Sequence, residues 1–357
     1  MTTAGNLFAQ QEANRKASRR LVAGFVIFLA WLGFGGDFIW YLASSRAAEG
    51  AASGAASVHV FPGVGLSLLL LAGAMAWWAY RFGATSLVKA TGAHELTEAE
   101  TEGQRQLMNI VDEMTIASGA SRPRVWLVPD DAPNAFATGV HANDAHLAVT
   151  TGLLDVCTRD EVQAVVAHEM GHIVNFDVRL MTLLTSLVGA VALVHNVASN
   201  TMRFGGGGGG GRSKSRGGGG DSKGAGPLVI VLLVVWVISW LVAPLVTRYM
   251  VMKVGRSREF LADAMSAQFT RNPAALADAL VKIGGSAVKP TAIPKSSAQL
   301  CISDPFHSAW DEREGRIANL MATHPPLRDR VSRLRSMAYQ EAGSGESLQR
   351  PLSMSEA

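Results

Sequence analysis

The chain has 357 residues, of which 48% are hydrophobic and 17% charged, and its net charge is +3. This charged fraction lies below the rough quarter that is usual for soluble domains, which favours membrane spans. The basic residues are scattered and partly flank apolar runs, so we expect a lipid bilayer as a partner and no nucleic acid.

Residues 1–20 are polar and end in a basic cluster, which predicts a cytoplasmic N-terminal segment. Apolar runs follow at residues 21–42, interrupted by Asp37, and at residues 61–80. Each has about the 20 residues that a bilayer requires, which predicts a two-helix transmembrane hairpin over residues 21–82. A cleaved signal peptide is the competing interpretation, but the first run exceeds its usual apolar core of about 7–15 residues.

A soluble segment with mixed patterns covers residues 83–179. Charged, helical periodicity runs through residues 95–114, and residues 160–174 have apolar positions at three- and four-residue steps. Residues 124–128 and 146–150 are short and rich in Val, Leu and Ala, which is typical of strands. Cys157 and Cys301 are outside any CxxC pair, which argues against a thiolate metal site and fits reduced thiols in a cytosol-facing domain.

A second hydrophobic hairpin is expected over residues 180–250. Its apolar runs cover residues 180–197 and 227–246, and the Gly-rich linker 204–226 between them cannot form a packed core. If both runs cross the membrane, the basic linker faces outward, against the positive-inside rule. Either the linker crosses nevertheless, or the two runs form a shallow or protein-packed hairpin.

The sequence His168-Glu169-Met170-Gly171-His172 contains the H-E-x-x-H pattern. Residues four apart share one face of a helix, so His168 and His172 could bind one metal ion. Glu169 points beside such an ion, where it could take a proton from a water molecule that zinc has made acidic. Burying these side chains on an apolar helix without a metal would be costly, which favours the metal site over a chance match.

A catalytic zinc needs a third protein ligand. Asn175 and Val178 stand where metzincins have Gly and His, so that class is excluded. Glu259 is the best candidate, and Asp263, four residues on, could hydrogen-bond a ligand imidazole. A solvated charged helix explains this spacing equally well. A shared metal also requires that both runs between His172 and Glu259 cross the membrane, or that neither does.

Four motifs together resemble the HtpX-type membrane metalloproteases, relatives of the type I CAAX prenyl proteases. They are the HEMGH helix, the segment REFLADA at residues 258–264, residues 134–139, and Thr323-His324-Pro325-Pro326-Leu327 followed by Arg330. The resemblance covers about residues 20–340. It implies an α+β fold, in which a mainly helical zincin-like catalytic domain with a small sheet is attached to about four transmembrane helices. Residues 251–340 would complete the catalytic domain, and residues 341–357 would form a disordered tail.

The resemblance also implies a set of site residues. His168, His172 and Glu259 would bind one Zn²⁺ per chain, Glu169 would be the catalytic acid and base, and Asp263 would support a ligand. His324 would act at the transition-state oxyanion, although a position before two prolines also suits a helix N-terminal residue. An edge strand would hold an extended polypeptide through backbone hydrogen bonds. Its residues are Asn134, Ala135, Phe136 and Ala137.

The function implied is a zinc metalloendopeptidase of the inner (plasma) membrane that removes misfolded or damaged membrane proteins. The enzyme would be multi-pass, with its catalytic domain facing the cytoplasm. A zinc-binding scaffold or chaperone without turnover is an alternative, although zinc binding alone does not need Glu169. A CAAX-type processing protease is a second alternative, but it would have more membrane spans. The linker at residues 205–226 is long for an HtpX-type protein, and it is a candidate gating element.

Overall fold

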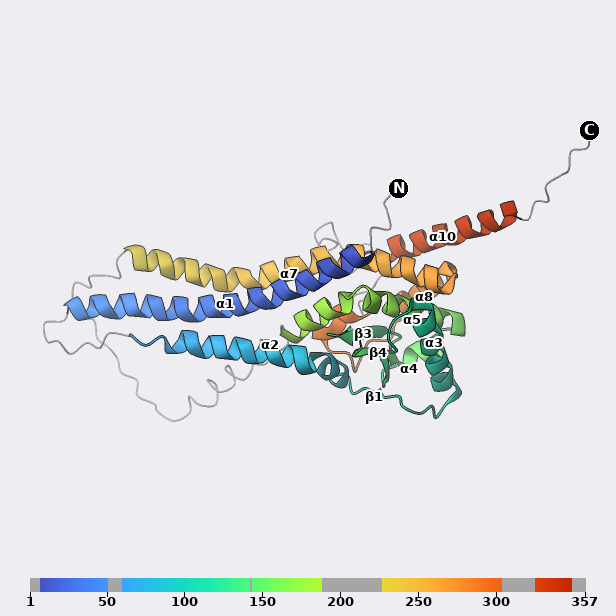
Figure 1. Cartoon of the computed structure of the whole chain (residues 1–357), viewed down its shortest axis with the longest axis horizontal. Helices are drawn as coiled ribbons and strands as arrows, with labels where there is room; N and C mark the ends of the chain where they lie inside the picture. Colours follow the sequence, from blue (N-terminus) through green and yellow to red (C-terminus); the bar gives the residue numbers. More distant parts are fainter. Residues whose placement is uncertain (1–6, 51–59, 142, 188–226, 304–324, 349–357) are drawn as a thin grey trace, which may run out of the picture. The chain divides into compact units, whose positions relative to one another are not determined.

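The computed structural model describes residues 7–50, 60–141, 143–187, 227–303 and 325–348 (Figure 1). The chain divides into two compact units. One comprises Met1–Ser18, Tyr80–Thr185 and Tyr249–Ala357, and the other comprises Arg19–Ala79 and Ser186–Arg248. The linker 204–226, predicted to be flexible, lies outside the described residues.

Three of the four apolar runs lie in long helices: α1 (Leu7–Gly50), α2 (Gly63–Lys89) and α7 (Pro227–Thr270). Within the described residues, two helices are long and apolar enough to cross a membrane, Gln11–Ser45 and Gly63–Lys89. Two apolar helices are thus present where the first hairpin was predicted, and their crossing of a membrane as a hairpin stays a prediction. The expectation of about four spans is not supported, and the run at residues 180–197 lies largely outside the part that the structure describes.

Asp37, the carboxylate that interrupts the first apolar run, contacts the beginning of α2. The amide of Gly65 donates a hydrogen bond to Asp37 Oδ2 at 2.6 Å. The first amides of a helix have no partner within the helix and attract negative charge. A side chain at Gly33 would lie 2.6 Å from Gly65 Cα, so glycine permits this close approach. Asp37 therefore has a structural role in the apolar unit.

A four-stranded mixed sheet lies in the other unit, in the order β1-β2-β4-β3. Its strands are β1 (His94–Glu95), β2 (Arg124–Val128), β3 (Ala135–Gly139) and β4 (Ala145–Thr150). The strands predicted at 124–128 and 146–150 are β2 and β4, which pair in parallel, and β3 pairs antiparallel with β4 at the edge of the sheet.

The helix predicted over residues 95–114 begins later and ends later than expected. Residues 94–95 pair with β2, and α3 covers Glu102–Ser118. Thr101 and Gln104 form a capping box at its start, and Gly119 ends it with a φ of 66°. The prediction of its start was wrong because charge and periodicity do not reveal a short pairing with a distant strand.

Both faces of the sheet are buried, as the alternation of side chains along a strand allows. Val125, Leu147 and Val149 face the main core, which α3, α5 (Arg159–Val174), α8 (Pro273–Gly285) and α10 (Leu327–Leu348) complete. Trp126, Phe136 and Ala148 face a second cluster with Val88 and Ile293. The short α4 (Thr151–Val156) and the 3₁₀ helix η1 (Lys295–Leu300) connect these parts.

The C-terminal segment is more ordered than expected. Helix α10 continues to Leu348, so residues 341–348 of the predicted disordered tail are helical, and residues 349–357 lie outside the described part. Residues 341–348 thus extend the helix that begins at Leu327.

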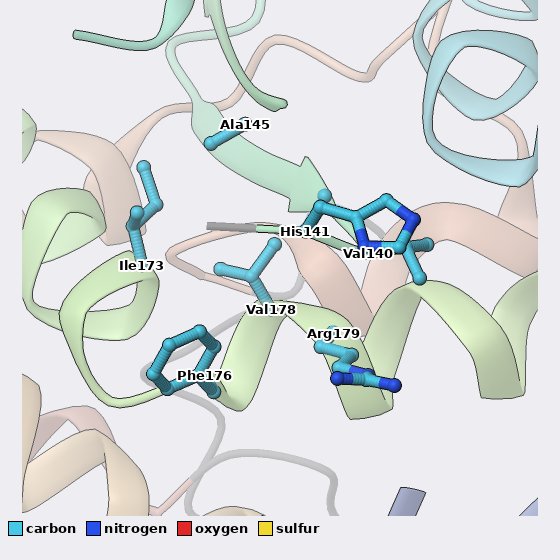
Figure 2. A pocket seen from close by; sticks show the side chains of 8 residues that line it. Val140, His141, Ala145, Ile173, Phe176, Val178 and Arg179 are labelled. Atoms are coloured by element: carbon cyan, nitrogen blue, oxygen red, sulfur yellow. The ribbon is translucent and has the colours of Figure 1, made fainter. Parts of the chain in front are cut away.

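The loop after α5 packs against the end of β3. Figure 2 shows a hollow where Val140 and His141 follow β3, with the side chains of Ile173, Phe176 and Val178 grouped on the other side. Phe176 has a φ of 58°, which is unusual for a bulky residue and persists only where neighbouring contacts enforce it. The hollow contains none of the predicted site residues.

Helices α5 and α7 approach closely at Gly171. A Cβ atom there would lie 3.3 Å from both Ala262 Cα and Met265 Cβ. Ser266 Oγ on α7 also donates to the carbonyl of Ala164 on α5 at 2.7 Å. The absence of a side chain at position 171 thus lets the two helices that carry the motifs lie in direct contact.

Replacing Gly171 by Val should destabilise the protein, because added methyl groups would force α5 and α7 apart at a cost of about 1–3 kcal/mol. Thermal unfolding in detergent with excess chelator measures this without the contribution of a metal. Gly103→Val is the matched control, since a Cβ at Gly103 in α3 meets nothing within 4 Å. Equal unfolding temperatures for the two variants would contradict the close helix contact.

Candidate metal centre

Helix α5 carries the H-E-x-x-H pattern and has a well-defined start. The Thr158 hydroxyl accepts from the Glu161 amide, and the Glu161 carboxylate accepts from the Thr158 amide, which forms a capping box. Lys282 Nζ donates to the same carboxylate at 2.7 Å. The helix predicted over residues 160–174 is confirmed, and it is buried along most of its length.

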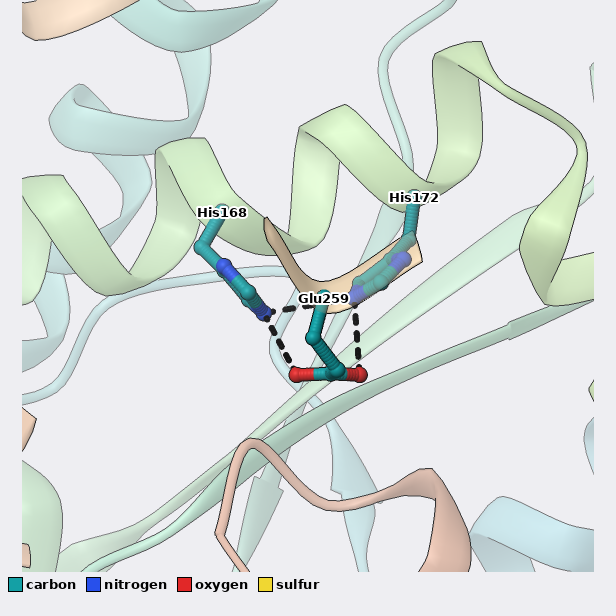
Figure 3. A group of neighbouring side chains, drawn as sticks. All are labelled: His168, His172 and Glu259. Carbon is teal, nitrogen blue, oxygen red and sulfur yellow. Dashed lines mark hydrogen bonds and ion pairs between the residues drawn. The ribbon is translucent and has the colours of Figure 1, made fainter. Parts of the chain in front are cut away.

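His168, His172 and Glu259, here called the His–His–Glu cluster, come together from α5 and α7. Figure 3 shows both imidazoles leaving the same side of α5 towards the Glu259 carboxylate. The two Nε2 atoms are 3.2 Å apart. Glu259 Oε2 lies 3.7 Å from His168 Nε2, and Oε1 lies 3.5 Å from His172 Nε2. Of the two interpretations of Glu259, the structure therefore favours proximity to the histidines over a solvated helix face.

These separations suit one tetrahedral ion. Zinc binds nitrogen and oxygen ligands at about 2.0–2.2 Å, so two of its ligand atoms lie roughly 3.3–3.6 Å apart. One atom from each member of the cluster lies within 4.8 Å of the others. His168 is fully buried and Glu259 is 8% exposed, so little solvent competes for the ion.

A carboxylate supports each histidine on the side away from the cluster. Asp263 Oδ1 lies 3.0 Å from His168 Nδ1, and Asp177 Oδ2 lies 3.3 Å from His172 Nδ1. Such contacts orient an imidazole and hold the proton on the outer nitrogen, which leaves Nε2 free to bind a metal. Asp263 was predicted from its spacing. Asp177 was missed, although a carboxylate placed just after a metal-binding helix offered a signal.

Arg330, on α10, brings a positive charge to two buried carboxylates, those of Asp263 and Glu259. It is 1% exposed and donates to both oxygens of Asp263, from Nε at 2.9 Å and from Nη2 at 2.7 Å. Its Nη1 lies 3.1 Å from Glu259 Oε2 and donates to the carbonyl of Ile302 at 2.8 Å. Arg330 belongs to one of the four motifs, the one that begins at Thr323, but its role was not predicted from the sequence.

Glu169 lies next to the cluster in surroundings that favour its neutral form. Burial and the charge of Glu259 together raise its pKa to about 7, against the opposing charges of His172 and Arg330. The backbone of Ala137 in β3 also stabilises the Glu169 carboxylate, which lowers this pKa. For His172, burial lowers the pKa, but hydrogen bonding to Asp177 and the charge of Glu259 outweigh it and raise the value to about 9. These surroundings suit Glu169 for proton exchange near neutral pH.

The four residues predicted to bind substrate lie at the start of β3, and all are buried. The Asn134 carbonyl accepts a hydrogen bond from the Thr150 amide in β4. In an antiparallel strand the backbone groups of successive residues point to opposite sides, so those of Ala135 and Ala137 face the outer edge of the sheet. At Ala135 the carbonyl accepts from Ile302 at 3.0 Å, and Phe136 forms an antiparallel bridge with Cys301. The expected open edge is therefore covered by the chain itself at Ala135, while Ala137 faces Glu169.

Among the predicted residues, the structure thus brings together His168, Glu169, His172, Glu259 and Asp263. The side-chain amide of Asn134 donates to the Ser303 carbonyl at 3.1 Å, which gives it a structural contact. His324 lies outside the described residues.

Comparison with known proteins identifies the family. Residues 101–338 match the model of peptidase family M48. The chain belongs to this family. It is 34% identical to the protease HtpX homolog of Streptococcus gordonii over 93% of this chain and 100% of that protein. It is 43% identical to the protease HtpX homolog of Levilactobacillus brevis over 65% of this chain and 73% of that protein.

A solved structure, that of S. mikatae Ste24p, matches with a TM-score of 0.44 and 16% identity over 92% of this chain and 66% of that chain. The M48 and HtpX matches, together with the two apolar helices, make this protein a membrane-associated metalloprotease. The family expected from the four motifs is confirmed.

Replacing Arg330 by Met should destabilise the protein by about 3–5 kcal/mol, because Asp263 and Glu259 would remain buried without their counter-charge. Unfolding in detergent with excess chelator measures the loss. Arg335→Met is the matched control on α10, since Arg335 is exposed and lies 3.6 Å from an equally exposed Asp278. It should cost less than about 0.5 kcal/mol. Similar losses in both variants would contradict the role given to Arg330.

Proposed function

We propose that this metalloprotease is a zinc-dependent endopeptidase in which His168, His172 and Glu259 bind one Zn²⁺. The observation that carries the proposal is the spacing of the His–His–Glu cluster, with Glu169 buried beside it. Two imidazoles and one carboxylate form a ligand set that catalytic zinc uses, with a fourth position left for water or substrate. Asp263 and Asp177 would keep the two imidazoles in the orientation that binds metal.

Glu169 would act as the general base and then as the general acid. A bound zinc ion supplies a Lewis acid that polarises the scissile carbonyl and lowers the pKa of water to about 7. Glu169, buried beside the cluster, would accept the proton of the attacking water. The same carboxyl group can then return the proton to the leaving amine, which closes the cycle without a second acid.

The substrate would be an extended polypeptide held along the outer edge of β3. Ala137 is the part of this edge nearest to Glu169, whereas Asn134, Ala135 and Phe136 form the start of the strand, where Ile302 is bound. Backbone hydrogen bonds to such an edge impose little sequence preference, which suits misfolded or damaged membrane proteins as substrates. His324 is proposed to assist at the oxyanion, as the resemblance implies.

The protein would be a multi-pass protein of the inner (plasma) membrane, with its catalytic unit in the cytoplasm. The supporting observation is the charge pattern, because Arg15, Lys16, Arg19 and Arg20 precede the first span and Arg81 follows the apolar part of the second. The residues that connect α1 and α2 would then face outward.

Replacing Glu169 by Gln should leave zinc binding intact and lower kcat by at least about 100-fold, because the general base is lost while all three ligands remain. The parent and the variant, both full-length in detergent, are compared for zinc content and for cleavage of an unfolded protein. Cleavage by the parent should stop with a chelator and return with Zn²⁺.

Two results would contradict this proposal. Well-folded parent protein without zinc would reject the metal site. Zinc-loaded parent that cleaves neither added protein nor itself would favour a zinc-binding scaffold instead.

The orientation can be tested by adding one cysteine at a time in a Cys157→Ser background, in which the remaining Cys301 is buried. Val60 precedes α2 and is 77% exposed, and Glu98 follows α2 on an exposed turn. A membrane-impermeant maleimide added to intact cells should label Val60→Cys, and it should label Glu98→Cys only after the membrane is opened. The reverse pattern would place the catalytic unit outside the cytoplasm.

A further inference from the structure

One face of the N-terminal end of α1 binds the loop that follows the H-E-x-x-H helix. Gln11 Nε2 donates to the Val174 carbonyl at 2.8 Å, and the Arg15 guanidinium lies 4.4 Å above the Phe176 ring. Asn14 Nδ2 donates to the Asn175 carbonyl at 2.7 Å. Residues 11, 14 and 15 share a helix face, so this face of α1 contacts the successive residues 174, 175 and 176.

Asn14 makes a further contact that leads directly to the cluster. Its Nδ2 also donates to Asp177 Oδ1 at 2.7 Å, and the other oxygen of Asp177 lies 3.3 Å from His172 Nδ1. Asn14 is 9% exposed and Asp177 is 2% exposed. Arg258 Nε, on α7, lies 3.3 Å from Asp177 Oδ1. The carboxylate that orients His172 is thus fixed from two sides, by α1 and by α7.

The conformation of the loop explains why a second element is needed. Phe176 has a φ of 58°, a left-handed conformation that is strained for a residue with a side chain. This conformation lies immediately before Asp177, which contacts His172. The carbonyl of residue 175 and the ring of residue 176 are both held by α1, so α1 stabilises the strained turn that presents Asp177.

We propose that Asn14 is a positioning residue for the metal centre, acting on His172 through Asp177. The N-terminal end of the first helix would then be a working part of the active site, although it lies far outside residues 101–338, which match the peptidase family. The inference rests on the proposed binding of zinc by His172. The carboxylate contact that Asn14 supports, between Asp177 and His172, is of a kind that changes metal affinity by about 10–100-fold when it is lost.

The test uses full-length protein in detergent, with Zn²⁺ affinity measured by competition with a chelating dye. Asn14→Ala should weaken zinc binding by about 10–100-fold and Asp177→Asn by at least as much. Because Asn14 acts through Asp177, the double variant should bind zinc no more weakly than Asp177→Asn alone. At saturating Zn²⁺, Asn14→Ala should regain most of its kcat with an unchanged KM.

Two controls on α1 separate positioning from simple packing. Arg15→Ala removes the contact with the Phe176 ring but keeps the Asn14–Asp177 hydrogen bond. It should lower the unfolding temperature while weakening zinc binding by less than about tenfold. Lys16→Ala alters an exposed ion pair with Glu12 and should change neither quantity. If Asn14→Ala does not fold, Asn14→Asp keeps the shape, removes the donor and repels Asp177, and should weaken zinc binding at least tenfold.

Parent-like zinc affinity in Asn14→Ala or Asn14→Asp would overturn the inference, and so would effects of Asn14→Ala and Asp177→Asn that add in full. Either result leaves the proposed function intact, because the parent still binds zinc. A folded parent that binds no zinc would instead overturn the proposed function and this inference with it.

Discussion

Two carboxylates, Glu259 and Asp263, are buried against the helix that carries the buried His168 and the partly buried His172. The rest of the site depends on how the charge of these groups is balanced. Burying unpaired carboxylates would cost several kcal/mol each. Arg330 offsets part of this cost through its two hydrogen bonds to Asp263 and its contact with Glu259. It also binds the Ile302 carbonyl, so the same guanidinium connects the His–His–Glu cluster to the segment that pairs with β3.

The cluster is assembled from distant parts of the chain, and each element contributes a different group to it. Helix α5 sets the spacing of the two imidazoles, and α7 supplies the carboxylates across the close contact at Gly171. Helix α10 contributes the charge of Arg330, while α1 and the loop after α5 fix Asp177. Glu169 lies between the cluster and Ala137 at the sheet edge, as the proposed transfer of a proton from water to a peptide requires.

The sequence pattern predicted those parts of the site that depend on contacts between residues close together in the chain. The ligand pair on α5 and the Glu259–Asp263 spacing on α7 follow from helical periodicity, and β2 follows from its β-branched and apolar composition. Asp177, Asn14 and the role of Arg330 were not found, because each depends on hydrogen bonds between residues far apart in the chain. The start of α3 was misplaced for a similar reason, since residues 94–95 pair with a strand about thirty positions later. His324 and the proposed linker function remain predictions.

Within the unit that holds the cluster, Glu259 and Ser266 belong to one continuous helix, α7, and Ser266 is fixed on α5 by its hydrogen bond to the Ala164 carbonyl. Each added residue turns everything beyond it by about 100° and advances it by about 1.5 Å. A single insertion between Glu259 and Ser266 would therefore swing the carboxylate away from the two imidazoles. Even seven residues, close to two whole turns, would restore the phase but displace the carboxylate by about 10 Å. The number of residues between these two positions is thus constrained by the geometry of the cluster, whatever side chains they carry on the exposed face.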